Sequence, residues 1–244
     1  VENGEVDKIN AANIDVTYTE WQSDTELAIA GLRSLETVIA TVDSTTESLT
    51  EVWSHQGISC GSVFFPSFAR LGGQANDYTL VTKGFMQSPE IAIIRKGVYQ
   101  SIASFDHGYN ALLETLVEKM EPLTWKAPDG LEIEGWLLHP KAGTKPYPLV
   151  MEVHGGPVAN YRTAWLGKSA VHVLMLLQKG YAVLRPNPRG SSGRGVEFAR
   201  KVKGDMGGAD TYDYLSGLDY LVDKGLCDPE RIGVMGVSYG GYMS

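Results

Sequence analysis

One serine in this chain has neighbours typical of a reactive side chain. Gly236-Val-Ser238-Tyr-Gly240 has the spacing G-x-S-x-G and ends the apolar, β-prone run from Ile232 to Val237. Glycine on either side of the serine permits a tight turn, because larger side chains there would collide. A strand that turns in this way lifts the serine hydroxyl above the sheet, where it can attack a carbonyl carbon. We predict Ser238 to be such a nucleophile.

A second glycine motif could stabilise the negative charge that this attack creates. His154-Gly-Gly-Pro157 directly follows the apolar run from Leu149 to Val153. In hydrolases with a serine turn, the oxyanion hole combines an N–H of this loop with the N–H that follows the serine. We therefore predict Gly156, or its neighbour Gly155, and Tyr239 as donors. A plain strand-to-helix turn is the alternative, and the order of the two motifs along the chain favours the oxyanion hole.

The general base is the missing part of this chemistry. A serine needs a histidine to remove its proton and a carboxylate to orient that histidine. In folds with this turn, the order along the chain is Ser, then Asp or Glu, then His, yet all five histidines precede Ser238: His55, His107, His139, His154 and His172. We interpret each as a surface or structurally hydrogen-bonded imidazole. Base and acid are expected after Ser244, and the 244 residues alone are expected to have negligible turnover.

Composition argues against several other classes of protein. The net charge of −8 disfavours nucleic acid and anionic membranes as partners. No apolar run approaches the roughly 18 residues of a membrane span. Cys60 and Cys227 stand alone, which predicts buried thiols in a reducing, cytoplasmic compartment rather than a disulfide framework. No cluster has metal-ligand spacing, and no cofactor is expected.

Two further polar segments are interpreted as structural. The loop from Asn187 to Gly195 is rich in glycine but lacks the spacing of phosphate-binding motifs, so we expect it to shape a pocket wall. Asp205 and Asp210 flank Gly207-Gly208 at the start of a helix and are interpreted as capping and loop-fixing carboxylates.

The elements that must position the two motifs alternate between strand and helix. A hairpin with an Asp129-Gly130 turn is followed by a Pro- and Lys-rich loop and a buried strand at 149–153. A helix over 164–178, a strand over 181–184, a helix over 209–224 with Leu215, Leu218, Leu221 and Val222 inward, and a third parallel strand over 232–237 complete the order. This pattern predicts an α/β fold with a parallel sheet. Ligands then bind at the carboxyl ends of its strands.

The first half of the chain shows only β patterns, with no helix before about residue 115. Short apolar runs recur at 14–18, 27–30, 37–42, 49–53, 62–65, 78–82, 91–94 and 99–103. A faint repeat of strand, turn, strand, turn, strand returns after roughly 50 residues, within the range of β-propeller blades. Two blades cannot close a propeller, so we expect the last blades of one. Pro122 marks a boundary, which predicts a partial β-propeller over 1–118 and an α/β-hydrolase domain over 119–244.

Five ordered motifs of the second half resemble the catalytic domain of the prolyl oligopeptidase family of serine peptidases. They are His154-Gly-Gly-Pro157, Arg189-Gly-Ser-Ser-Gly-Arg-Gly195, Gly204-Asp-Met-Gly-Gly208, Asp228-Pro-Glu-Arg-Ile-Gly233 and Gly236-Val-Ser-Tyr-Gly-Gly-Tyr242. The likeness is strongest to acylaminoacyl-peptidase and dipeptidyl-peptidase-like members. It implies a propeller that gates an α/β-hydrolase site, oligopeptide substrates, Ser238 as nucleophile, and the Gly156 and Tyr239 N–H groups as oxyanion donors.

The sequence departs from this family at three positions. Some relatives have a tyrosine at the position of His154 and use its hydroxyl as an oxyanion donor, so here backbone donors are favoured over the His154 side chain. Arg194 and Met206 stand where relatives usually have an aromatic residue and often a tryptophan, which leaves substrate preference open. A carboxylesterase or lipase on the same fold, and a catalytically inactive fragment, remain alternatives.

Overall fold

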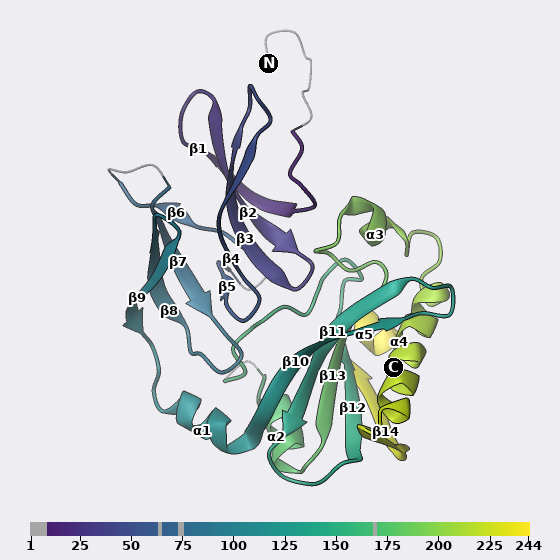
Figure 1. Cartoon of the computed structure of the whole chain (residues 1–244). Coiled ribbons are helices and arrows are strands. Elements are labelled where there is room, and N and C mark those ends of the chain that lie inside the picture. Colours follow the sequence, from purple (N-terminus) through teal and green to yellow (C-terminus); the bar gives the residue numbers. More distant parts are fainter. Residues whose placement is uncertain (1–8, 63–64, 73–75, 168–169) are drawn as a thin grey trace.

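Three β-sheets make up most of the structure (Figure 1). A computed structural model describes residues 9–62, 65–72, 76–167 and 170–244. The strands of the first half are β1 (Asp15–Trp21), β2 (Glu26–Arg33), β3 (Glu36–Asp43), β4 (Leu49–His55), β5 (Ser59–Cys60), β6 (Ala69–Arg70), β7 (Tyr78–Lys83), β8 (Glu90–Arg95) and β9 (Val98–Ser104). The elements of the second half are α1 (Tyr109–Leu116), β10 (Val117–Lys126), β11 (Glu132–Pro140), β12 (Tyr147–Val153), α2 (Val171–Gln178), β13 (Ala182–Asn187), α3 (Val196–Arg200), α4 (Ala209–Asp223), β14 (Cys227–Gly236) and α5 (Tyr239–Tyr242).

The first half forms two antiparallel sheets, with strand orders β1-β2-β3-β4 and β5-β7-β8-β9. The two predicted repeats are the meanders β2-β3-β4 and β7-β8-β9, one in each sheet. An apolar cluster lies between the sheets and combines Ala30 and Ile39 with Tyr78, Leu80 and Ile94. Within the described residues these strands do not close into a ring. Seven of the eight predicted runs lie in strands, and the run at 62–65 includes two residues outside the described ranges.

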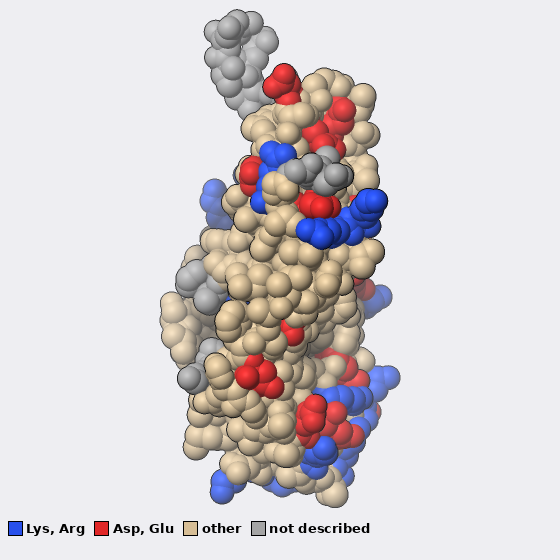
Figure 2. Space-filling model, turned by 90° about the vertical axis from the view of Figure 1, so that its left-hand side faces the viewer, with Lys and Arg blue, Asp and Glu red and all other residues tan. Residues whose placement is uncertain are grey.

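The outer face of the second antiparallel sheet carries few charges near its middle. In Figure 2, Lys, Arg, Asp and Glu gather towards the two ends of this side of the molecule. Exposed apolar side chains of β7, β9 and the segment after it include Val81, Val98, Ile102 and Phe105. The acidic and basic residues of the chain are therefore unevenly spread over this face.

The second half forms one mixed sheet with the order β10-β11-β13-β12-β14. β12 pairs in parallel with β13 on one side and β14 on the other, as the alternating pattern predicts. The β10–β11 hairpin turns at Asp129-Gly130, and Gly130 has φ +83°. Successive side chains of β11 alternate between two cores: Ile133 and Leu137 face the cluster that includes α4, and Leu138 faces the cluster that includes α2. Helices therefore cover both faces of the sheet.

The structure corrects one expectation around the end of the first half and places Pro122 within a strand. The helix α1 was not expected, and it buries only Leu113, so its two turns leave no clear apolar period in the sequence. Pro122, interpreted from the sequence as marking a boundary, lies inside β10 and pairs with Trp136; the domain boundary itself stays a prediction. A proline is tolerated there because β10 is an edge strand, whose outward N–H groups make no ladder bonds.

Two corrections concern the helices of the second half. The helix predicted from residue 164 begins at Val171, because the preceding segment bonds to the first half instead: Leu166 N–H donates to the Phe85 carbonyl at 3.2 Å. In α4, Leu215 is exposed rather than inward. The buried face of that helix is formed by Asp210, Asp213, Tyr214, Gly217 and Leu221, so polar residues occupy its first turns. Among the described residues no helix is long and apolar enough to cross a lipid bilayer.

Candidate active site

Ser238 sits in a sharp turn between β14 and α5. Its φ of 59° and ψ of −122° are values that non-glycine residues rarely adopt, and such backbone strain is concentrated at functional sites. Two glycines make the turn possible: a Cβ on Gly236 would lie 2.4 Å from the Gly240 carbonyl carbon, and one on Gly240 would lie 2.0 Å from the Val153 oxygen. The strand, turn and helix start that the G-x-S-x-G spacing predicts are all present, and Ser238 is exposed.

The loop after β12 lies directly against this serine. A Cβ built on Gly155 would approach the Ser238 Cβ to 3.3 Å and its Oγ to 3.9 Å. Gly156 has φ +128°, a conformation that side chains rarely allow. The fold therefore brings together two motifs that are more than 80 residues apart, and it leaves backbone rather than side chains next to the hydroxyl.

His154 is fully engaged in holding this loop. It is 7% exposed; its Nδ1 lies 2.7 Å from the Gly155 carbonyl oxygen and its Nε2 lies 3.0 Å from Ser191 Oγ. A carbonyl only accepts, so Nδ1–H donates to Gly155, and the neutral ring accepts the Ser191 hydroxyl proton at Nε2. Burial lowers the pKa of His154, which favours this neutral form. Neither ring nitrogen is left to donate to an oxyanion.

The bond from His154 also fixes the predicted donor. The Gly155 carbonyl and the Gly156 N–H belong to one planar trans peptide unit and point in opposite directions. When the imidazole holds the carbonyl, it sets the direction of the Gly156 N–H. His154 therefore acts on the loop through its side chain, in a way that the sequence did not reveal.

The loop after β13 supports the loop after β12. Asn187 is 1% exposed, and its amide bonds both backbone groups of Tyr161: it accepts from the N–H at 2.7 Å and donates to the carbonyl at 2.9 Å. The N–H of Ser192 donates to the Ala159 carbonyl at 3.0 Å. Arg189 in turn binds Asp213, which is fully buried, and Asp129 of the hairpin turn, at 2.8 Å each. The glycine-rich segment 187–195 is thus a scaffold for the serine site.

A pocket of about 420 Å³ continues along the same loop. Val158 and Tyr161 line it from this loop, Arg185 from β13, Ser192 from the loop after β13, and Phe65 from the first half of the chain. The Arg185 guanidinium lies 4.9 Å from the centre of the Tyr161 ring and bonds Glu152 through Nε at 2.7 Å. The pocket wall therefore combines apolar surface with a cation that is paired with a carboxylate.

The two carboxylates at the start of α4 have different roles. Asp205 accepts the Ala209 N–H at 2.9 Å and so fixes the loop, as predicted. Asp210 is 1% exposed and instead accepts a hydrogen bond from the Tyr239 hydroxyl. Helical spacing could have shown that Asp210 is buried, because Asp210, Tyr214 and Leu221 lie on the same face of α4; it could not have shown the bond to Tyr239.

The histidines bond elsewhere in the part of the chain that the structure describes. His55 accepts the Gly57 N–H, His139 bonds Glu121, and His172 bonds Glu152. His107 is exposed. No hydrogen bond to Ser238 Oγ is present among the described residues, and no group of His, Cys, Asp and Glu there could hold a metal ion.

A comparison with known protein families finds one match. Residues 168–244 match the family model of the prolyl oligopeptidase family. The last third of the chain is thus similar to this family. The resemblance found in the motifs is confirmed, and the family is one of serine peptidases.

Curated relatives share about half of this chain. "Uncharacterized peptidase YuxL" of Bacillus subtilis is 41% identical over 128 residues, which are 51% of this chain and 19% of that protein. "Probable dipeptidyl-peptidase 5" of Emericella nidulans is 33% identical over 122 residues, 49% of this chain and 17% of that protein. The chain thus spans about a fifth of the length of these family members.

Solved structures share the fold over nearly the whole chain. The acylaminoacyl peptidase of Pyrococcus horikoshii superposes with a TM-score of 0.77 at 21% identity, covering 96% of this chain and 35% of that one. An acylaminoacyl peptidase in complex with Z-Gly-Gly-Phe-chloromethyl ketone gives a TM-score of 0.75 at 23% identity, covering 99% of this chain and 36% of that one. The arrangement of the sheets is therefore that of acylaminoacyl peptidases.

Proposed function

We propose that this chain is part of a serine peptidase that hydrolyses short peptides through an acyl-enzyme on Ser238. The observation that carries the proposal is the approach of the Gly155 loop to the strained, exposed serine. A substrate carbonyl placed between them would meet the hydroxyl on one side and backbone N–H groups on the other. The family and the peptidase names of the relatives support a peptide as the substrate.

The proposed reaction has two acyl-transfer steps. Ser238 Oγ attacks the peptide carbonyl carbon and gives up its proton to a general base, while the N–H groups of Gly156 and Tyr239 stabilise the oxyanion. The C–N bond then breaks, the base returns the proton to the leaving amine, and water repeats the sequence on the acyl-enzyme. Losing one oxyanion donor of this kind costs on the order of 10²–10³ in rate. We propose that base and orienting acid lie outside residues 1–244, in agreement with the chain order Ser, Asp, His.

The proposal assigns parts of the fold to parts of the function. Residues 1–118 would be the last blades of a β-propeller, and 119–244 the beginning of an α/β-hydrolase domain. The pocket beside Tyr161 is bounded by both halves and would receive the peptide chain. The likeness in fold to acylaminoacyl peptidases, one of them bound to a peptide-like chloromethyl ketone, supports this assignment.

The decisive experiment compares variants of the full-length natural protein. Ser238→Ala should abolish fluorophosphonate labelling and lower kcat on a peptide-anilide by about 10⁴–10⁶-fold. Ser48→Ala, at an exposed turn of the first half, is the matched control and should retain both. Labelling or turnover that persists in Ser238→Ala would contradict the assignment of Ser238 as the nucleophile. Faster cleavage of a short-chain ester with no cleavage of the anilide would favour an esterase.

A further inference from the structure

The side chain of Tyr239, the residue after the serine, reaches away from the site to the start of α4. Its hydroxyl donates to Oδ2 of Asp210 and accepts the Gly207 N–H at 3.1 Å. The Gly207 N–H can only donate, so the single hydroxyl proton is directed at Asp210. Two hydrogen bonds thus tie the serine turn to another element.

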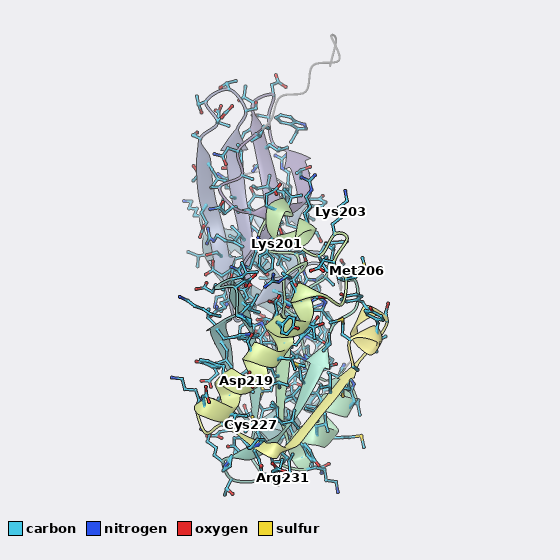
Figure 3. All side chains as sticks on the ribbon, turned by 90° about the vertical axis from the view of Figure 1, so that its right-hand side faces the viewer. Lys201, Lys203, Met206, Asp219, Cys227 and Arg231 are labelled. Atoms are coloured by element: carbon cyan, nitrogen blue, oxygen red, sulfur yellow. The ribbon has the colours of Figure 1, made fainter. Side chains whose placement is uncertain are left out.

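The loop from Gly204 to Gly208 has room for the side chains of Tyr239 and Tyr242 because it contains glycine. Gly207 has φ +76°, and a Cβ there would lie 2.7 Å from the Tyr242 hydroxyl. The Tyr242 ring packs on the Tyr239 ring with 5.7 Å between centroids. Asp205 closes the loop by accepting the N–H groups of Gly208 and Ala209. Figure 3 shows Met206 in this loop on the side of α5. The motif from Gly204 to Gly208 thus contacts the serine turn, and its Gly207 N–H binds the Tyr239 hydroxyl.

Asp210 is an unusual residue to bury at this place. It is 1% exposed, its second oxygen Oδ1 has no hydrogen-bond partner, and no Lys, Arg or His among the described residues forms an ion pair with it. A buried carboxyl group without a cation is costly unless a specific bond requires it. Burial and the Asp210 bond both raise the pKa of the Tyr239 hydroxyl, which therefore remains a donor at neutral pH.

The backbone N–H of Tyr239 is available to donate a hydrogen bond to a substrate. Tyr239 is the first residue of α5, and within the described residues its N–H donates no hydrogen bond, whereas the next three N–H groups bond to Val237 and Ser238 carbonyls. The direction of this N–H follows the orientation of Tyr239. The backbone of the serine turn fixes one end of the residue, and the two hydrogen bonds of its hydroxyl fix the other.

We propose that Asp210 is a positioning residue that aims the Tyr239 N–H at the oxyanion by holding the Tyr239 hydroxyl. The inference rests on the proposed function and deepens it, since it concerns the same site. It also gives a reason for the buried carboxyl group of Asp210 in α4, next to the loop that contacts the serine turn.

The test measures kcat and KM in the full-length protein, with active sites titrated by a fluorophosphonate. Tyr239→Phe and Asp210→Ala should each lower kcat by about 10- to 100-fold with KM within about threefold, because the interaction acts on the transition state. Asp210→Asn should recover most of the rate, since an amide oxygen can accept the same proton. The double variant Asp210→Ala/Tyr239→Phe should be no slower than the slower single variant, because both remove one bond.

Matched controls come from the same helix. Tyr212→Phe and Asp219→Asn change exposed residues of α4 and should leave kcat unchanged; Asp219 is labelled in Figure 3. Unchanged kcat per titrated site in Tyr239→Phe and Asp210→Ala, with or without a lower melting temperature, would overturn the inference. Losses that multiply in the double variant would do the same. Wild-type protein that is not labelled at Ser238 would instead contradict the proposed function.

Discussion

The loop after β12 leaves the middle of the mixed sheet, whereas the serine turn after β14 leaves its edge. β12 has a neighbour on both sides, and β14 is the last strand in the order. His154, at the end of β12, is 7% exposed, and Val237, just after β14, is 80% exposed. The two loops that would share one oxyanion thus start from very different surroundings.

The two loops are also held by different kinds of contact. Buried polar side chains hold the loop after β12: His154 on Gly155 and Asn187 on Tyr161. The serine turn is held by close backbone packing of Gly236 and Gly240, and by one tyrosine side chain. One loop therefore depends mainly on hydrogen bonds of buried side chains, and the other depends mainly on close backbone packing at two glycines.

The largest effect should come from filling the space at the turn. Gly240→Ala places a Cβ 2.0 Å from the Val153 oxygen, a rigid backbone atom, so we expect a loss of about 3 kcal/mol or more in stability. Gly241→Ala is the matched control, because its nearest atom would be 3.5 Å away, and it should change stability by less than about 1 kcal/mol. Urea unfolding measures both. Equal stability of the two variants would show that the turn does not depend on glycine packing.

A smaller effect should follow from removing the anchor of the other loop. Asn187→Ala deletes two short hydrogen bonds and leaves the Tyr161 N–H and carbonyl unsatisfied, which should cost about 2–4 kcal/mol. Asn160→Ala loses one bond of 3.4 Å and should cost less than about 1 kcal/mol. The same unfolding experiment applies. If both variants are equally mild, buried polar bonds do not hold this loop.

The smallest effect is the pH dependence of stability that His154 gives the loop after β12. Burial lowers the folded-state pKa of His154 below 6.5, so the unfolded chain binds more protons in the window between the two values. Stability is therefore full above about pH 6.5 and falls as the pH drops toward the folded-state pKa, by at most about 1.4 kcal/mol per pH unit. Tyr239, with its raised pKa, adds no such slope at this pH.

The difference between wild type and His154→Asn isolates this contribution. His139, whose pKa burial also lowers, acts equally in both proteins and cancels in the difference. The stability difference should shrink as the pH falls from 7 to 5. A difference that stays constant over this range would show that His154 does not titrate on unfolding, and that acid does not distinguish the two loops.

Much of the fold was predictable because its signals are local. The apolar run at 149–153, the Asp129-Gly130 turn and the glycines of G-x-S-x-G each specify a backbone conformation within a few residues. The spacing of Ser238 and the His154–Pro157 motif likewise predicted loops at one end of parallel strands, and the structure places these loops in contact. The roles of Ser238, Gly156 and Tyr239 in catalysis stay predictions.

The errors arose where distant residues compete with local preference. The segment 164–167 has an apolar pattern that suits a helix, but its backbone bonds to Phe85 of the first half. Leu215 was expected inside because it is apolar, yet Asp210 and Asp213 occupy the buried face, where each has a specific hydrogen-bond donor. No local pattern shows that a carboxyl group will meet its partner.

The sequence by itself thus determined most of the strands and the two glycine turns, since these depend on backbone conformations that a few neighbouring residues impose, and its motifs showed the resemblance to the family. Only the tertiary structure decided what holds the turns in place. The pairs His154–Ser191, Asn187–Tyr161 and Asp210–Tyr239 join residues 26 to 37 positions apart, and each forms because the packed sheet and helices bring their polar atoms within bonding distance in the interior.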